Sequence, residues 1–219
     1  MRLLDLIFPP RCAGCLRPGH AWCARCAGGL RPAMRDRLRG VPLVAAGRLE
    51  GPFQQAIHTY KYRPRPALAG PLAEPLLRAI RPAEFRLDAL TFVPLHPVRQ
   101  RRRGFNQSER LATELARPLG TPILPGLARV RATPPQVGLS EAERRANLAG
   151  AFRWVGPLPA PRAAGLVDDV CTTGATLEAA AEAIEEAGGR VAAFLVLAVA
   201  QTLPGTVVTF PGSSTYSQI

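Results

Sequence analysis

The chain has 219 residues, with 28 Lys and Arg against 16 Asp and Glu, so its formal net charge is +12. This length suits one domain of ordinary size with a small appendage, and an apolar fraction of 47% can fill a core. The mean hydropathy is +0.04 and no apolar run approaches the roughly 18 residues of a spanning helix, which argues against membrane insertion. The apolar stretch 3–8 is too short for a signal-peptide core, so we expect a cytoplasmic protein.

The basic excess consists almost entirely of arginine, with Lys61 as the single lysine. Contacts between basic side chains and phosphates dominate nucleic-acid binding, so this charge is compatible with such a partner. The accompanying Ala, Pro and Gly bias is also what a GC-rich genome would produce, and small phosphate ligands need positive sites too. Charge alone therefore favours a nucleic-acid partner only slightly.

The first motif is a pair of Cys-x-x-Cys turns separated by seven residues and formed by Cys12, Cys15, Cys23 and Cys26. Four thiolates in two such turns predict a closed tetrahedral zinc site of the structural kind. So short a head cannot build an adequate core, hence we expect the metal to supply much of its folding energy. A redox pair or an iron–sulfur site is the alternative. His20 is a substitute ligand or a solvated loop residue, and Trp22 packs over the site or stacks on single-stranded nucleic acid.

After the head and an Arg-rich connector (together 1–41), a main domain is expected over 42–200, followed by a tail at 201–219 that is either an edge strand or disordered. The expected elements are a strand at 43–46, a helix at 52–62, a helix-like segment at 68–80 interrupted by Pro71 and Pro75, an apolar run at 89–95, a helix at 106–119, a strand at 163–167, a helix at 175–187 and a strand at 191–200. This alternation predicts an α/β domain with a mostly parallel sheet flanked by helices.

The most specific chemistry follows the strand at 163–167, where Asp168 and Asp169 precede a short turn into a helix. The free N–H groups and the positive dipole at a helix N-terminus attract an anion, and paired carboxylates suit the two hydroxyls of a ribose, directly or through hydrated magnesium. At this turn Gly174 allows the backbone to approach a phosphate closely, and Thr172, Thr173 and Thr176 can add hydroxyl donors. The alternative is that these Asp and Thr side chains only cap the helix.

Two upstream segments are candidates to complete this site. An apolar run ends near residue 95 and leads into an Arg- and Gly-rich stretch, which suits a pyrophosphate because arginine offers a planar fork of donors; a solvated basic turn is the alternative. The candidate pyrophosphate loop consists of Leu95, His96, Arg99, Arg103 and Gly104. The polar stretch 131–147 reads as a long loop, in which Ser140 and Glu143 can cap a short helix. It is either a lid or an exposed connection, and the candidate lid residues are Gln136, Ser140, Arg144 and Asn147.

Taken together, these motifs resemble the ComF (competence protein F) family. The resemblance covers about residues 10 to 200 and is carried, in order, by the Cys-rich head, Tyr60-Lys61-Tyr62, Arg103-Gly104-Phe105-Asn106-Gln107, the stretch from Gln136 to Asn147, and Asp168–Thr176. It implies a type I phosphoribosyltransferase-like fold behind a zinc-ribbon-like head, with a role in natural transformation or the use of external DNA. Asp168–Thr176 also resembles the phosphoribosyl-pyrophosphate (PRPP) signature of type I phosphoribosyltransferases. This implies that Asp168 and Asp169 bind the ribose hydroxyls, with magnesium accompanying PRPP. It also implies that the 5′-phosphate is bound by Cys171, Thr172, Thr173, Gly174, Ala175 and Thr176.

Three functions remain open from the sequence. One is an enzyme that hydrolyses PRPP or transfers its ribose 5-phosphate to an acceptor for which no motif is present. Another is a module of DNA uptake that contacts single-stranded DNA or a helicase partner. The third is a regulator that senses PRPP without turnover. An intact Asp pair and phosphate turn favour real ligand binding in each case.

Overall fold

The computed structural model describes residues 9–30, 35–63, 65–81, 85–131, 141–156 and 160–200. Its centre is a five-stranded sheet of order β1-β2-β7-β6-β3, in which every neighbouring pair except β1–β2 is parallel. The strands of this sheet are β1 (Arg35–Leu38), β2 (Val41–Arg48), β3 (Ala89–Phe92), β6 (Ala164–Cys171) and β7 (Val191–Val199). The expected α/β class with a mostly parallel sheet is confirmed.

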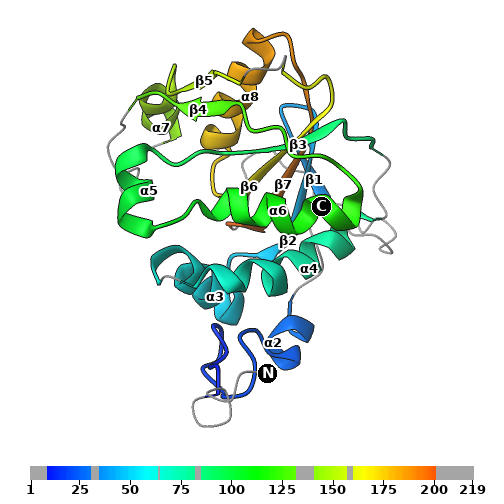
Figure 1. The fold of residues 1–219 in the computed structure, drawn as a ribbon, viewed down its shortest axis with the longest axis vertical. Helices are drawn as coiled ribbons and strands as arrows, with labels where there is room; N and C mark the ends of the chain where they lie inside the picture. The colour runs from blue at the N-terminus through cyan, green and yellow to red at the C-terminus, as the bar shows by residue number, and fades with distance from the viewer. Residues whose placement is uncertain are drawn as a thin grey trace, which may run out of the picture.

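Helices cover both faces of this sheet (Figure 1). The helical segments are α2 (Ala24–Gly28), α3 (Gly51–Tyr62), a 3₁₀ turn (Pro66–Leu68), α4 (Ala69–Ile80), α5 (Pro97–Arg103), α6 (Gln107–Leu119), α7 (Glu141–Leu148) and α8 (Ala175–Glu186). Along β2, Val44 and Ala46 pack into the core shared with α3, α4 and α6, whereas Leu43 and Ala45 pack into the core shared with α8. Burial on both faces is the physical reason why the central strands are continuous apolar runs. No helix among the described residues is both long and apolar enough to cross a membrane.

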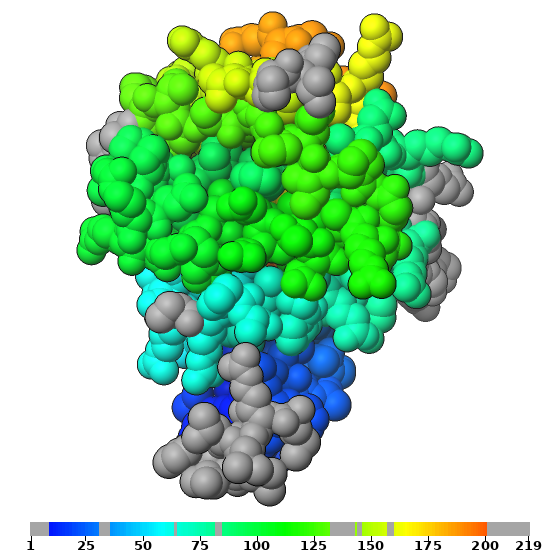
Figure 2. Space-filling model, in the orientation of Figure 1, coloured from blue at the N-terminus to red at the C-terminus, as the bar shows by residue number. Residues whose placement is uncertain are grey.

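The cysteine head packs directly on the main domain. Figure 2 shows the head, in blue, against the cyan α3–α4 region at one end of the molecule. Trp22 stacks obliquely on Phe53 at the start of α3, with ring centroids 5.9 Å apart. A side chain at Gly14 would lie 2.7 Å from the Pro52 carbonyl oxygen, so this approach requires glycine. Cys12, Cys26 and Trp22 therefore belong to the same buried cluster as the main-domain helices.

Helix α4 differs from the sequence expectation because neither proline interrupts it. Pro71 is the third residue of the helix, where a backbone N–H has no intrahelical partner to lose. Pro75 lies in the interior and removes one hydrogen bond. Leu72 and Leu76, both fully buried, hold that helix against the sheet and offset the loss.

Two strand pairings are absent from the sequence expectations. Strand β1 lies within the stretch expected to be a connector, and it joins β2 through Arg39 and Gly40, whose φ values are 53° and 77°. Two positive φ values in a two-residue loop define a hairpin turn that usually carries Asn-Gly or Asp-Gly, so Arg-Gly gave little signal. The second pairing joins β4 (Leu127–Arg129) and β5 (Phe152–Trp154), which are too short to show a period.

Candidate functional site at the carboxyl edge of the sheet

The two acidic residues Asp168 and Asp169 lie near the carboxyl end of β6, which runs beyond the expected end of this strand to Cys171. Both are buried, with 9% and 8% of their surface exposed. The Ser108 hydroxyl donates a hydrogen bond of 2.8 Å to Asp168 Oδ1, and the Asp169 backbone N–H donates another of 2.8 Å to the same oxygen. Ser108 thus anchors one carboxylate from the first turn of α6.

The other carboxylate pairs with Lys61, the last-turn lysine of α3, whose Nζ lies 2.8 Å from Asp169 Oδ1. Burial by itself lowers the pKa of Lys61, but the charge of Asp169 and its hydrogen bond, with a smaller contribution from Asp168, raise that pKa above its ordinary value. The ammonium is therefore charged at neutral pH. Lys61 brings a fixed positive charge to the carboxylate pair.

Burial, followed by the neighbouring charge of Asp169, raises the pKa of Asp168 to about 7, while Lys61 and the Ser108 hydroxyl act in the opposite direction. Two carboxylates side by side in a buried site cannot both ionise easily. Without a ligand, the pair thus holds a proton well above the ordinary range of an aspartate. A cation or a set of hydroxyl donors at this place would favour the doubly charged form.

The turn after β6 has the geometry of an anion site. Gly174 is the N-cap of α8, with φ 87°. A Cβ added at Gly174 would lie 2.6 Å from Leu38 Cδ1. Thr172 is exposed and Thr173 and Thr176 are half-buried. The first N–H groups of a helix have no intrahelical partner, so those of α8 are available to an anion at this turn.

Cys171 closes β6 as a buried residue. Burial, and then the charges of Asp168 and Glu178, raise the pKa of its thiol to about 12. A thiol with that pKa is neutral and a poor nucleophile near pH 7. Its position indicates packing beneath the turn rather than covalent chemistry.

The candidate pyrophosphate loop follows β3 and contains the short helix α5. This helix was not expected from the sequence. The side chain of His96 caps α5 by accepting a hydrogen bond of 3.4 Å from the Val98 N–H, and Gly104 ends the helix with φ 80°. Leu95, half-buried, precedes that cap. The guanidinium of Arg103 bonds Gln107 Oε1 at 2.9 Å and stacks on an aromatic ring. Arg103 is thus held at the start of α6, and its contact with a pyrophosphate stays a prediction.

The start of α6 is fixed by a set of buried hydrogen bonds. Asn106 donates to the Val93 carbonyl at 3.1 Å and accepts from the Ser108 N–H at 3.0 Å. The Tyr60 hydroxyl donates to the Gln107 carbonyl at 2.9 Å. These bonds tie α3, β3 and α6 together, and they position Ser108 against the carboxylate pair.

A further cation approaches the site from β4. Burial lowers the pKa of Arg129, and the charge of Arg99, on α5, lowers that pKa further. The charge of Asp168 raises it. Arg129 also lies over Phe152, with its guanidinium carbon 5.4 Å from the ring centroid. The charge of Arg129 thus interacts favourably with that of Asp168 and unfavourably with that of Arg99.

Of the candidate lid residues, Gln136 and Ser140 lie outside the described residues. The short helix expected after Ser140 is present as α7. Arg144 lies on α7, and Asn147 is half-buried, with its carbonyl accepting a hydrogen bond of 2.9 Å from Arg131. The lid role of this segment stays a prediction.

The four head cysteines form a cluster whose sulfur atoms all lie within 4.8 Å of one another. Cys12 and Cys26 are 3.8 Å apart at sulfur, and Cys15 and Cys23 are 3.7 Å apart, too far for disulfides. Tetrahedral zinc with bonds of about 2.3 Å places its sulfur ligands about 3.8 Å apart. The cluster is therefore spaced to bind a metal ion such as zinc.

Comparison with known proteins places the chain in a family, although no family model matches it. It is 32% identical to "Competence protein F" of Haemophilus influenzae over 195 residues, which cover 81% of this chain and 85% of that protein. It is 34% identical to "DNA utilization protein YhgH" of Escherichia coli (strain K12) over 205 residues, covering 91% and 86%. The chain belongs to the competence protein F family. The expected family and the α/β fold behind a four-cysteine head are both confirmed.

Solved structures give only distant likenesses to this competence protein F family member. An orotate phosphoribosyltransferase from Aeropyrum pernix matches with a TM-score of 0.37 and 18% identity, over 80% of this chain and 78% of that one. An adenine phosphoribosyltransferase matches with a TM-score of 0.37 and 16% identity, over 82% and 92%.

Three residues at the sheet edge of this family member were not assigned a role from its sequence. Lys61 lies in the Tyr60-Lys61-Tyr62 motif, which the sequence analysis used only for recognition. Ser108 directly follows the motif that ends at Gln107, and Arg129 lies in no motif. The signal for Lys61 was present, because it is the single lysine of an arginine-rich chain and sits between two tyrosines. Its ion pair with Asp169 joins residues 108 positions apart and depends on the packing of α3 against β6.

Proposed function

We propose that the chain binds magnesium–PRPP at the carboxyl edge of its sheet and uses it in DNA uptake or DNA utilisation, as the names of its relatives suggest for those proteins. One observation carries the proposal. A buried carboxylate pair at the end of a parallel strand, with its own lysine and serine partners, directly precedes a glycine-capped helix N-terminus. Ligands of open α/β sheets bind at this kind of edge.

In this arrangement the ribose hydroxyls would donate hydrogen bonds to Asp168 and Asp169, and the 5′-phosphate would lie against the turn at 171–176. Lys61 would hold the Asp169 carboxylate in place through its 2.8 Å contact. The backbone N–H groups at the start of α8 would receive the phosphate, because they have no partner within the helix.

Transfer breaks the bond between ribose C1 and the pyrophosphate oxygen, whose electrons leave with pyrophosphate while positive charge develops on the ring. A lone pair of the acceptor, or of water in hydrolysis, then forms the new bond to C1. The charge of Arg129 interacts with that of Asp168, so Arg129, together with Arg99 from the candidate pyrophosphate loop, would stabilise the departing anion. Magnesium that arrives with PRPP would neutralise part of the pyrophosphate charge. Closure of the segment 131–147 over the ligand would exclude water from the cationic ring.

Thermal melting tests the binding proposal. Saturation at about 100 times the dissociation constant adds about 2.7 kcal/mol of stability, which should raise the Tm by about 5 to 10 °C. Asp168→Asn with Asp169→Asn should abolish this shift. Glu185→Gln with Glu186→Gln, which removes two exposed carboxylates from α8, should retain it. An unchanged wild-type melting curve in the presence of magnesium–PRPP would overturn the proposal.

Turnover is a separate question from binding. A screen of nucleobases, nucleosides and amines for PRPP-dependent pyrophosphate release would identify an acceptor if the protein is a transferase. A binding shift with no release for any acceptor would favour the second candidate, a PRPP-sensing module of the DNA-handling apparatus. The names of the relatives favour that candidate as much as they favour an enzyme.

A further inference from the structure

A second candidate site, lined by arginines, lies between the cysteine head and the main domain. A cavity of about 690 Å³ opens there, with walls formed by the head, by the end of β2 and by the start of α3. Three arginines line it: Arg17 and Arg25 from the head, and Arg48 from the last position of β2. Glu50 is the one carboxylate among its lining residues.

The three guanidiniums are available to a ligand. Within the part of the chain that the structure describes, the side chains of Arg17, Arg25 and Arg48 form no ion pair or hydrogen bond. Helix α3 begins at the same cavity, and the side chain of its N-cap residue Glu50 makes no capping hydrogen bond. Free guanidiniums around a concave space, next to a helix N-terminus, provide the donors that phosphate oxygens accept.

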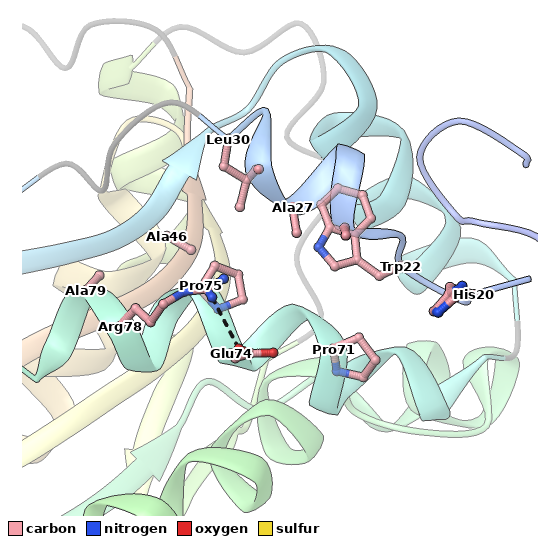
Figure 3. Close-up of a pocket in the computed structure, with 12 residues that line it drawn as sticks. His20, Trp22, Ala27, Leu30, Ala46, Pro71, Glu74, Pro75, Arg78 and Ala79 are labelled. Carbon is pink, nitrogen blue, oxygen red and sulfur yellow. Dashed lines mark hydrogen bonds and ion pairs between the residues drawn. The ribbon is translucent and has the colours of Figure 1, made fainter.

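A neighbouring cavity shows that this charge is specific to one place. Figure 3 shows that cavity, of about 710 Å³, between α2 and α4, where Trp22, Pro71 and Pro75 contribute apolar walls. Its arginine, Arg78, forms an ion pair of 3.2 Å with Glu74. Two cavities of similar size thus flank α2, and only the one at the β2 end has unpaired arginines among its described lining.

One alternative role for these arginines is to offset the charge of a metal-loaded head, because four thiolates around a divalent ion carry a net charge of −2. That explanation suits Arg17 and Arg25, which lie within two residues of head cysteines, but Arg48 belongs to the sheet. Across the sheet, Arg48 pairs with Val199, which also pairs with Cys171. Two strand spacings place the Cα atoms of Arg48 and Cys171 about 10 Å apart. The arginine cavity therefore shares the sheet edge with the turn at 171–176.

We propose that this cavity binds the phosphate of a nucleotide or of a nucleic-acid strand, at a site distinct from the carboxylate pair. Arg48 and Arg17 contact the phosphate oxygens from opposite walls, and the start of α3 supplies backbone donors. The inference is independent of PRPP binding, because it rests on other residues and on another cavity.

Fluorescence anisotropy with the metal-loaded full chain tests the proposal. The probes are a labelled single-stranded oligonucleotide of about ten nucleotides and, in competition, 5′-AMP. Arg17→Gln with Arg48→Gln should weaken oligonucleotide binding at least about tenfold. The slope of log affinity against log salt concentration should become shallower by about 0.7 per lost phosphate contact. Arg162→Gln with Arg190→Gln removes the same charge at the opposite edge of the sheet and should change affinity less than about twofold.

Equal losses in the two double variants would show a non-specific effect of net charge and overturn the proposal. Arg48→Gln alone decides the matter if the head substitution releases metal, because Arg48 lies outside the head. Loss with both probes identifies a phosphomonoester site, and loss with the oligonucleotide alone identifies a strand site. Binding should survive Asp168→Asn with Asp169→Asn; its disappearance in that variant would assign the phosphate to the carboxylate-pair site instead.

Discussion

The cysteine head and the carboxyl edge of the sheet are two polar sites built in opposite ways. The head gathers its four sulfurs from 15 consecutive residues, Cys12 to Cys26, in two turns. The sheet edge gathers Lys61, Ser108 and Asp168 from three elements that are separated along the chain. One site is specified by spacing in the sequence, and the other exists only when α3, α6 and β6 are packed.

The difference also concerns the source of stability. The buried residues of the head belong to the cluster that it shares with the main-domain helices, so we expect the head to depend on a metal ion and on its contact with α3. The sheet edge lies in a well-packed domain that can tolerate unfavourable groups, including a carboxylate whose pKa is raised to about 7. Strain and charge repulsion of this kind are concentrated at functional sites.

Metal removal should give the largest effect. Because Cys12, Cys26 and Trp22 share a core with α3 and α4, loss of the metal should lower the Tm of the whole chain by about 10 °C or more. Cys12→Ser with Cys15→Ser should lose the metal, whereas Cys171→Ala should keep one ion per chain by metal analysis. An unchanged Tm after complete metal removal would show that the head is independent of the main domain.

Breaking the ion pair at the sheet edge should rank next. Lys61→Met leaves the buried Asp169 without its cation and should cost about 3 kcal/mol in denaturant unfolding at pH 7. Lys61→Met with Asp169→Asn removes both charges and should recover most of that loss. If the double variant were as unstable as the sum of the two single variants, the pair would not be coupled as the structure shows.

The pH dependence of stability should identify the strained carboxylate. An ordinary aspartate has a pKa of about 3.9, while that of native Asp168 is raised to about 7. The native state then binds more protons than the unfolded state between these values, so stability falls as pH rises from about 4 to 7. At pH 8 the free energy of unfolding of Asp168→Asn should therefore exceed that of wild type by about 1 to 2 kcal/mol, and at pH 5 the difference should be smaller.

Two glycines with similar backbones separate strain from packing. Gly174 and Gly188 have φ values of 87° and 79°, but only the former faces a neighbour, Leu38. Each substitution by alanine should cost about 1 kcal/mol for its backbone, and Gly174→Ala should cost about 1 kcal/mol more for the contact. Urea unfolding of both variants, with Leu38→Ala added to each, measures that difference. Equal costs would contradict close packing of β1 on the turn.

The smallest effect is expected at the exposed pair between Arg39 and Glu182, 3.3 Å apart, which links the β1–β2 turn to α8. Surface pairs of this kind contribute little because solvent screens them. Arg39→Ala should change the free energy of unfolding by less than about 0.5 kcal/mol. A larger loss would show that the hairpin depends on this contact rather than on burial of Leu38.

The sequence by itself determined the features that depend on local spacing. The two Cys-x-x-Cys turns predicted the sulfur cluster, and the apolar runs before Asp168 and after Gly189 predicted the parallel core strands, because a strand buried on both faces has no polar positions. The order of motifs also indicated the family. The run from Asp168 to Thr176 located the candidate site before any packing was known.

Only the tertiary structure decided which distant residues meet at that site. Lys61 and Ser108 reach the carboxylate pair because α3 and α6 pack beside the end of β6, and no local pattern encodes that meeting. Tertiary packing likewise kept α4 continuous through Pro75, since burial of its leucines outweighs one missing hydrogen bond. Side-chain chemistry follows from sequence, whereas the electrostatic partners of a buried group follow from the fold.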